Sequence, residues 1–105
     1  MGSDYKLYRL GADGRTIPAG KAVVVIAINP AAATITLTPD GGASAITDHA
    51  PGGNILHGSD SAVAVSGLSG TPYALSASGS PAAIDFRRFN GVSIPAGKAY
   101  YIVVP

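Results

Sequence analysis

The chain has 105 residues, of which 47% are apolar and 12% are charged, and its formal net charge is +1. It contains no cysteine, which excludes both a disulfide framework and a thiolate zinc site. The basic residues are scattered rather than gathered into a stripe, which argues against nucleic acid as a partner. The longest apolar run, Ala22–Ile28, is too short to cross a membrane, so we expect no direct membrane insertion.

The residue types favour strands over helices. Glu and Gln are missing, whereas Val, Ile, Thr and Ser are frequent, and the 14 glycines and 8 prolines supply turns. No segment shows a convincing 3.6-residue periodicity. The length suits one domain over residues 1–105, with residues 1–4 as boundary residues. The sequence therefore predicts a single all-β domain.

The first 38 residues contain three predicted strands, at Tyr5–Leu10, Lys21–Ile28 and Ala33–Thr38. The Asp-Gly pair within Gly11–Gly14 is typical of a hairpin turn. Lys21–Ile28 is nearly continuously apolar, which predicts burial on both faces. Ala33–Thr38 alternates Thr with larger apolar residues, as a half-buried strand does.

Turns and short strands follow. Pro39–Gly42 and Ala50–Gly53 are predicted turns, with a short strand near Ser44–Thr47 between them. Asn90-Gly91 is the strongest two-residue hairpin signal in the chain, and Val92–Ile94 would be its second strand. About eight to ten short strands in all predict a β-sandwich or a partly closed β-barrel. The remaining predicted strands are Ala62–Val65, Tyr73–Ser76, Ala83–Phe89 and Lys98–Val104.

One six-residue sequence occurs twice. Ile-Pro-Ala-Gly-Lys-Ala occupies residues 17–22 and again residues 94–99, and a glycine leads each copy by three positions. The extended copies, 14–25 and 91–102, lie 77 positions apart, so they are not the repeats of a short-period solenoid. They predict an internal pseudo-repeat, with equivalent strand pairs in one pseudo-symmetric domain.

Turn chemistry explains every residue of this motif. The proline fixes φ for the first corner of a turn, and the following glycine takes the left-handed conformation that leads into a strand. In that strand the lysine would face water and the alanine the interior. The alternative is that the two lysines form a binding feature. We predict a structural role for Gly14, Pro18, Gly20 and Lys21 in the first copy and for Gly91, Pro95, Gly97 and Lys98 in the second.

Catalytic and metal-binding arrangements are weak in this sequence. The two histidines, His49 and His57, could join Asp48 and Asp60 at a metal, but their spacing matches no metal motif, and both are predicted to be solvent-exposed loop residues. Ser66-Gly-Leu-Ser-Gly70 resembles a nucleophile elbow, yet no helix is predicted after it. All six acidic residues are Asp, whose short side chains in so small a domain leave little cleft for paired-carboxylate chemistry. We predict no enzymatic activity, no metal and no cofactor.

Aromatic residues are the better candidates for ligand contact. Strand alternation places Tyr100 and Tyr101 on opposite faces of the last strand, so at least one ring is expected at the surface. Exposed tyrosines beside polar or charged groups often hold sugars or proteins. The candidate ligand-binding residues are therefore Tyr100, Tyr101 and Arg87. The alternatives are that the rings cap the core and that the Arg87-Arg88 pair protects a solvated strand edge.

The chain resembles a family of β-rich, often C-terminal domains in secreted and surface proteins of gut Bacteroidetes and related anaerobes, a family of unknown function. Its first motif copy, with Tyr8-Arg-Leu before it, is similar to their "F-Y-[KR]-L…G-x-T-I-P-A-G-K-A" segment. Asn54-Ile-Leu-His-Gly-Ser59 and the second motif copy also match. The chain departs from the pattern at Asp85-Phe-Arg-Arg-Phe89, where the family has Gly-Phe-Tyr/Phe-Lys.

The resemblance implies an extracellular or cell-surface accessory module, with any signal peptide outside this sequence. We expect a non-enzymatic adhesion or spacer module that contacts a glycan or another surface protein. The first alternative is a carbohydrate-binding module. The second is a phage fibre or head-decoration domain that forms an oligomer, because Ile-Pro-Ala-Gly chain ends also occur in such proteins. The oligomeric state and the identity of the ligand do not follow from the sequence.

Overall fold

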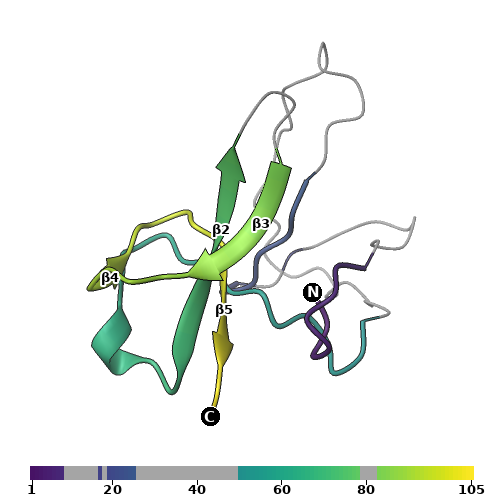
Figure 1. The fold of residues 1–105 in the computed structure, drawn as a ribbon, viewed down its shortest axis with the longest axis horizontal. Coiled ribbons are helices and arrows are strands. Elements are labelled where there is room, and N and C mark those ends of the chain that lie inside the picture. The colour runs from purple at the N-terminus through teal and green to yellow at the C-terminus, as the bar shows by residue number, and fades with distance from the viewer. Residues whose placement is uncertain (9–16, 18, 26–49, 79–82) are drawn as a thin grey trace.

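The computed structural model describes residues 1–8, 17, 19–25, 50–78 and 83–105. The regular elements are nearly all strands, which confirms the all-β prediction (Figure 1). No helix within these described ranges is long and apolar enough to cross a membrane. In chain order the elements are β1 (Val63–Ala64), the 3-10 turn η1 (Val65–Gly67), β2 (Thr71–Ser78), β3 (Ala83–Arg88), β4 (Ser93–Ile94) and β5 (Tyr100–Val103). Outside the described residues lie the predicted elements at Gly11–Gly14, Ala33–Thr38, Pro39–Gly42 and Ser44–Thr47, together with Gly14, Pro18 and His49.

β2 lies at the centre of a three-stranded antiparallel sheet, with β3 along one side and β5 along the other (Figure 1). The register places Tyr73 opposite Tyr101 and Ala74 opposite Tyr100. Because successive side chains of a strand point to opposite faces, the first pair shares one face of the sheet and the second pair shares the other.

The sequence located these three strands correctly. Each overlaps a predicted strand, at Tyr73–Ser76, Ala83–Phe89 and Lys98–Val104. β2 extends two residues beyond the predicted strand at each end. It includes Pro72, although a proline has no N–H to donate to a neighbouring strand. Its carbonyl is still paired, since it accepts a hydrogen bond of 2.9 Å from the amide of Phe89.

The predicted hairpin at Asn90-Gly91 is wrong. β4 pairs with β1, where Ile94 is opposite Val63, and does not pair with β3. The amide of Val65 extends this contact by donating to the carbonyl of Val92 at 3.0 Å. Burial of Ile94 outweighs the local turn signal. Its side chain is 0% exposed, and it reaches the core on a strand that pairs with β1 and not with β3.

The core lies between one face of the three-stranded sheet and the β1–β4 pair. Its buried residues are Ile94, Ala74 and Tyr100, the last of which is 7% exposed. Leu56 is the other large side chain that is fully buried among the described residues. The half-buried residues packed against this core are Val63, Val65, Leu68, Phe89 and Ile102.

The two motif copies flank one short segment, residues 56–58. On the side of the first copy, the amide of Gly58 donates to the carbonyl of Gly20 at 3.0 Å, and the amide of Ala22 donates to the carbonyl of Leu56 at 3.1 Å. These two bonds lie on either side of an isolated antiparallel bridge between Lys21 and His57. This is the widely spaced hydrogen-bond pattern of an antiparallel pair.

The second copy binds the opposite edge of this segment. His57 and Tyr100 exchange both of their backbone hydrogen bonds, at 2.7 Å and 3.1 Å, and form a second antiparallel bridge. The amide of Gly97 also donates to the carbonyl of Ser59 at 2.8 Å. The backbone groups of residues 56–58 thus alternate between the two copies, as in a central strand.

The glycine turns of the two copies have the predicted geometry. Gly20 has φ of 81° and Gly97 has φ of 77°, both in the left-handed region. In the second copy the amide of Lys98 closes the turn onto the carbonyl of Pro95 at 3.3 Å. The prediction of a left-handed glycine after Pro-Ala is therefore confirmed in both copies.

The strand expected at Lys21–Ile28 is wrong over its described part. Lys21 forms only an isolated bridge, and residues 22–25 are not in a strand. Val25 is 57% exposed, which contradicts burial on both faces. The physical reason is the short partner, because the hydrogen bonds to residues 56–58 end at Ala22.

The strand expected at Tyr5–Leu10 is also wrong over residues 5–8. The amide of Tyr5 bonds the carbonyl of Gly2 at 2.9 Å, and the amide of Gly2 bonds the carbonyl of Lys6 at 3.0 Å. Tyr5 itself has φ of 60°, which is uncommon for a non-glycine residue. Asp4 accepts a hydrogen bond from the amide of Lys6 at 3.2 Å. These local bonds form a compact turn instead of an extended ladder.

Candidate aromatic binding face

The two adjacent tyrosines of β5 have different surroundings. The ring of Tyr100 lies in the core, with its centroid 5.4 Å from that of the His57 ring, so little of it is available to a ligand. Tyr101 is half-buried on the opposite face of the sheet. Of the two tyrosines proposed for ligand contact, Tyr101 is therefore the one whose position suits that role.

Tyr101 is the centre of a group of four aromatic rings. Its ring is stacked on that of Tyr73, with centroids 5.4 Å apart and planes 5° apart. Phe86 lies at 5.3 Å with its plane tilted by 55°, and Tyr5 lies at 5.3 Å with its plane tilted by 40°. Each of these contacts falls within the range in which aromatic pairs attract one another. We call the sheet surface that carries these four rings the aromatic face.

Strand register brings three of these rings together. Tyr73 is the direct partner of Tyr101, and Phe86 of β3 is the partner of Leu75, two residues further along β2. A two-residue step keeps a side chain on the same face, so the rings from β2, β3 and β5 meet there.

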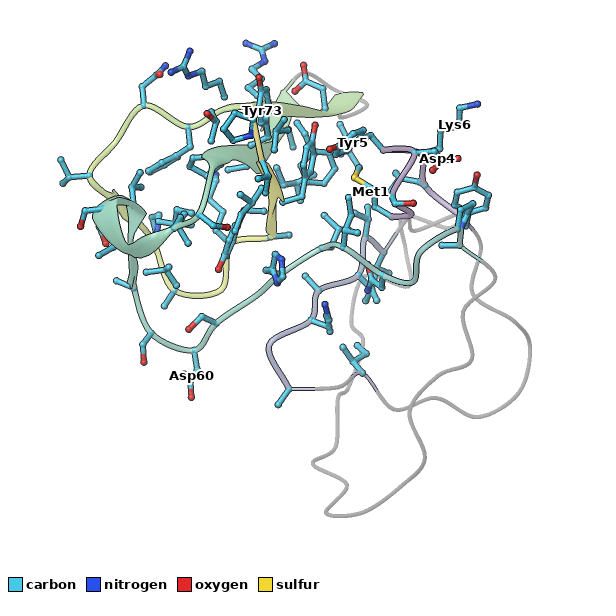
Figure 2. The ribbon with its side chains drawn as sticks, turned by 90° about the horizontal axis from the view of Figure 1, so that it is seen from below. Met1, Asp4, Tyr5, Lys6, Asp60 and Tyr73 are labelled. Carbon is cyan, nitrogen blue, oxygen red and sulfur yellow. The ribbon has the colours of Figure 1, made fainter. Side chains whose placement is uncertain are left out.

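The fourth ring comes from outside the sheet. The turn at residues 2–6 directs Tyr5 toward the sheet, on the side where Tyr73 lies, as Figure 2 shows. Its side chain remains 47% exposed. Tyr5 thus extends the aromatic face beyond the strands themselves.

The tyrosine hydroxyls of this face lie close enough to influence one another. Burial raises the pKa of Tyr101, and the neighbouring hydroxyls of Tyr73 and Tyr5 raise that pKa further because two phenolates would repel each other. The hydroxyl of Tyr101 therefore stays protonated through the neutral pH range, as a hydrogen-bond donor and acceptor.

The neighbouring arginines of β3 lie on opposite faces of the sheet. Arg88 is the register partner of Tyr73 and is exposed on the aromatic face. Arg87 is the partner of Ala74 on the other face, where its Nε donates to the Oδ2 of Asp85 at 3.0 Å in an exposed ion pair. Arg87, the predicted contact, is thus separated from Tyr101 by the sheet, whereas Arg88 shares its face.

His57 is not the exposed loop residue that the sequence predicted. It is half-buried between the two motif copies, and burial, followed by the positive charge of Lys21, holds its pKa below the ordinary value. Asp60 lies on an exposed loop away from Tyr5 and Tyr73 (Figure 2). Within the described part of the chain, no three His, Cys, Asp or Glu side chains gather as a metal site would require.

The remaining motif residues take structural positions. A Cβ atom on Gly91 would lie 2.7 Å from the ring of Phe89, so a larger residue here would require that ring to move. Lys21, Lys98 and the alanine after each are all half-buried, so the expected contrast between a lysine in water and an alanine in the interior is absent.

The sequence does not predict most of the residues that surround Tyr101. Tyr73, Phe86 and Arg88 carry no local signal of a shared surface, because their meeting depends on strand order and register. Once both the order and the register of β2, β3 and β5 are known, period-two alternation places them on one face. Tyr5 reaches the same surface through a turn that the sequence assigned to a strand.

No protein-family model, curated protein or solved structure matches this chain. The resemblance to surface domains of gut Bacteroidetes therefore stays a prediction, as do the single-domain boundaries.

Proposed function

We propose that this chain is a non-enzymatic accessory module of a secreted or surface protein, and that it contacts its ligand through the aromatic face. The observation that carries the proposal is the group of rings around Tyr101, which joins three strands and the N-terminal turn on one surface. Tyr73, Phe86 and Tyr101 are half-buried, and Tyr5 is more exposed.

Tyrosines supply both kinds of contact that such a module needs. Their rings offer apolar area at a small cost in side-chain entropy, and their hydroxyls exchange hydrogen bonds with polar ligands. A glycan or the surface of another protein is therefore a suitable ligand. The extracellular setting rests on the resemblance described above.

A glycan array combined with an array of extracellular proteins tests this proposal. Wild type should bind specific spots, and Tyr101→Ala should lose them because the centre of the aromatic face is removed. Tyr8→Ala is the matched control, since Tyr8 is exposed and its hydroxyl donates to Asp4 rather than joining the rings. Circular dichroism of both variants verifies the fold.

Two results would contradict the proposal. One is a folded wild-type protein that binds nothing on either array, which would favour a pure spacer. The other is equal loss of binding in Tyr8→Ala and Tyr101→Ala. Size-exclusion chromatography of the same samples examines the fibre alternative, which requires a stable oligomer.

A further inference from the structure

We infer that the ligand of the aromatic face is an acidic saccharide, and that Arg88 binds its carboxylate. This inference rests on the proposed function and adds the chemical class of the ligand. It starts from one row of side chains across the sheet, in which Arg88, Tyr73 and Tyr101 are successive register partners on β3, β2 and β5.

The register sets the spacing of that row. Directly opposed residues on adjacent strands have Cβ atoms about 4.5–5.5 Å apart, so Arg88 is within reach of a ligand group that also touches Tyr73. Neighbouring strands lie about 4.8 Å apart, which separates the backbones of Arg88 and Tyr101 by about 9–10 Å. Two linked sugar rings can span such a row.

The charge on this surface is positive. Among the described strand residues that alternate onto the aromatic face, Arg88 is the charged one, and it forms no ion pair with any described residue. Asp85 lies on the opposite face and is paired with Arg87. Asp4 lies in the N-terminal turn, where the hydroxyl of Tyr8 donates to it and lowers its pKa. The guanidinium of Arg88 is therefore available to an anionic ligand that contacts the rings.

The three partners suit different parts of an acidic sugar. The apolar C–H face of a pyranose packs against an aromatic ring, and tyrosine hydroxyls bond to sugar hydroxyls. A guanidinium binds a carboxylate through two parallel N–H···O bonds, which is stronger and more directional than a contact with a lysine. A uronic acid unit presents both its ring and its carboxylate to this row.

Calorimetric titration with oligogalacturonate tests this inference, with a matched pair of variants. Arg88→Gln should weaken binding about tenfold or more, the usual value of a charged hydrogen bond. Arg87→Gln should change the affinity by less than about twofold, because Arg87 lies on the other face. Both arginines are exposed, so both variants should fold as wild type does.

Two control ligands separate charge from sugar. Fully methyl-esterified oligogalacturonate keeps the rings but has no charge, and polyglutamate has carboxylates but no sugar rings. We expect both to bind at least tenfold more weakly than oligogalacturonate. Tyr101→Ala should also lose binding to oligogalacturonate.

Several outcomes would overturn the inference. Equal losses in Arg87→Gln and Arg88→Gln would indicate general charge attraction, as would equal binding of polyglutamate. Equal binding of the methyl ester, or Tyr101-dependent binding of neutral glycans alone, would refute the acidic ligand and leave the proposed function standing. If the chain binds neither oligogalacturonate nor any spot on the two arrays, the proposed function fails as well.

Discussion

The two faces of the three-stranded sheet are built differently, although they alternate residue by residue along the same strands. One face presents Ala74 and Tyr100 to a core that the β1–β4 pair completes through Ile94. The other presents Tyr73 and Tyr101 as half-buried rings. The difference shows that ring content alone does not mark a core, since adjacent tyrosines on β5 have opposite environments.

Because of this contrast, we expect residues on the two faces to affect different properties of the protein. Substitutions on the core face should lower the free energy of unfolding, because a buried side chain loses apolar contacts and leaves a cavity. Substitutions on the aromatic face should change binding more than stability. Two matched pairs separate the two effects, namely Tyr100 with Tyr101 on β5, and Ile94 on β4 with Ile84 on β3.

The largest expected effect is that of Tyr100→Ala. Removing this buried ring should lower the free energy of unfolding by about 3–5 kcal/mol, whereas Tyr101→Ala, with its ring half-buried, should cost roughly half as much or less. Urea denaturation of both variants measures the difference. Equal costs would mean that the faces do not differ in the way described.

A second pair compares isoleucines. Ile94→Ala should destabilise by about 2–5 kcal/mol because its side chain is fully buried. Ile84→Ala, at a β3 residue that is 40% exposed and aligned with the aromatic face, should cost less than about 1.5 kcal/mol. Thermal unfolding ranks the two variants, and a reversed order would contradict the assignment of the core.

Gly97 lies in the turn that leads into β5, the strand that carries both tyrosines. A side chain at φ of 77° is strained even though space is available, so Gly97→Val should cost about 1–3 kcal/mol. Gly97→Asn should cost less, since Asn tolerates the left-handed region. A melting temperature of Gly97→Val equal to wild type would refute this role, and Gly20→Val provides the same comparison in the first copy.

The smallest expected effect is a loss of stability at acidic pH caused by His57, the bridge partner of Tyr100 on β5. The pKa of His57 is below its ordinary value of 6.5 in the folded chain, so the unfolded chain binds more protons as the pH falls through 6.5. Stability should therefore be complete above that pH and decline below it. His57→Gln should remove part of this decline between pH 7.5 and 5. An unchanged slope in the variant would show that His57 does not contribute.

Local sequence signals were sufficient for some elements and not for others. β2, β3 and β5 follow from short β-forming runs between turn signals, and Gly20 and Gly97 follow from turn chemistry. The hairpin at Asn90-Gly91 fails because burial of Ile94 is worth more than a favourable turn. No local pattern could show that residues 56–58 would separate the two motif copies, since that arrangement consists of long-range backbone hydrogen bonds.

The sequence likewise predicts only part of the candidate site. Alternation separates Tyr100 from Tyr101, but it does not determine which of them faces the core. The sequence does not show that Arg88, and not Arg87, shares the face of Tyr101, because it does not give the register of β3 against β2. Tyr5 was missed because its left-handed φ belongs to a turn that carries no glycine at that position.

The most direct measurement is NMR of the aromatic side chains during titration with oligogalacturonate. We expect the ring resonances of Tyr5, Tyr73 and Tyr101 to shift together with one dissociation constant, while those of Tyr100 and His57 stay in place. Shifts confined to Tyr100 and His57, or a titration that moves no ring resonance, would contradict the assignment of ligand contact to the aromatic face.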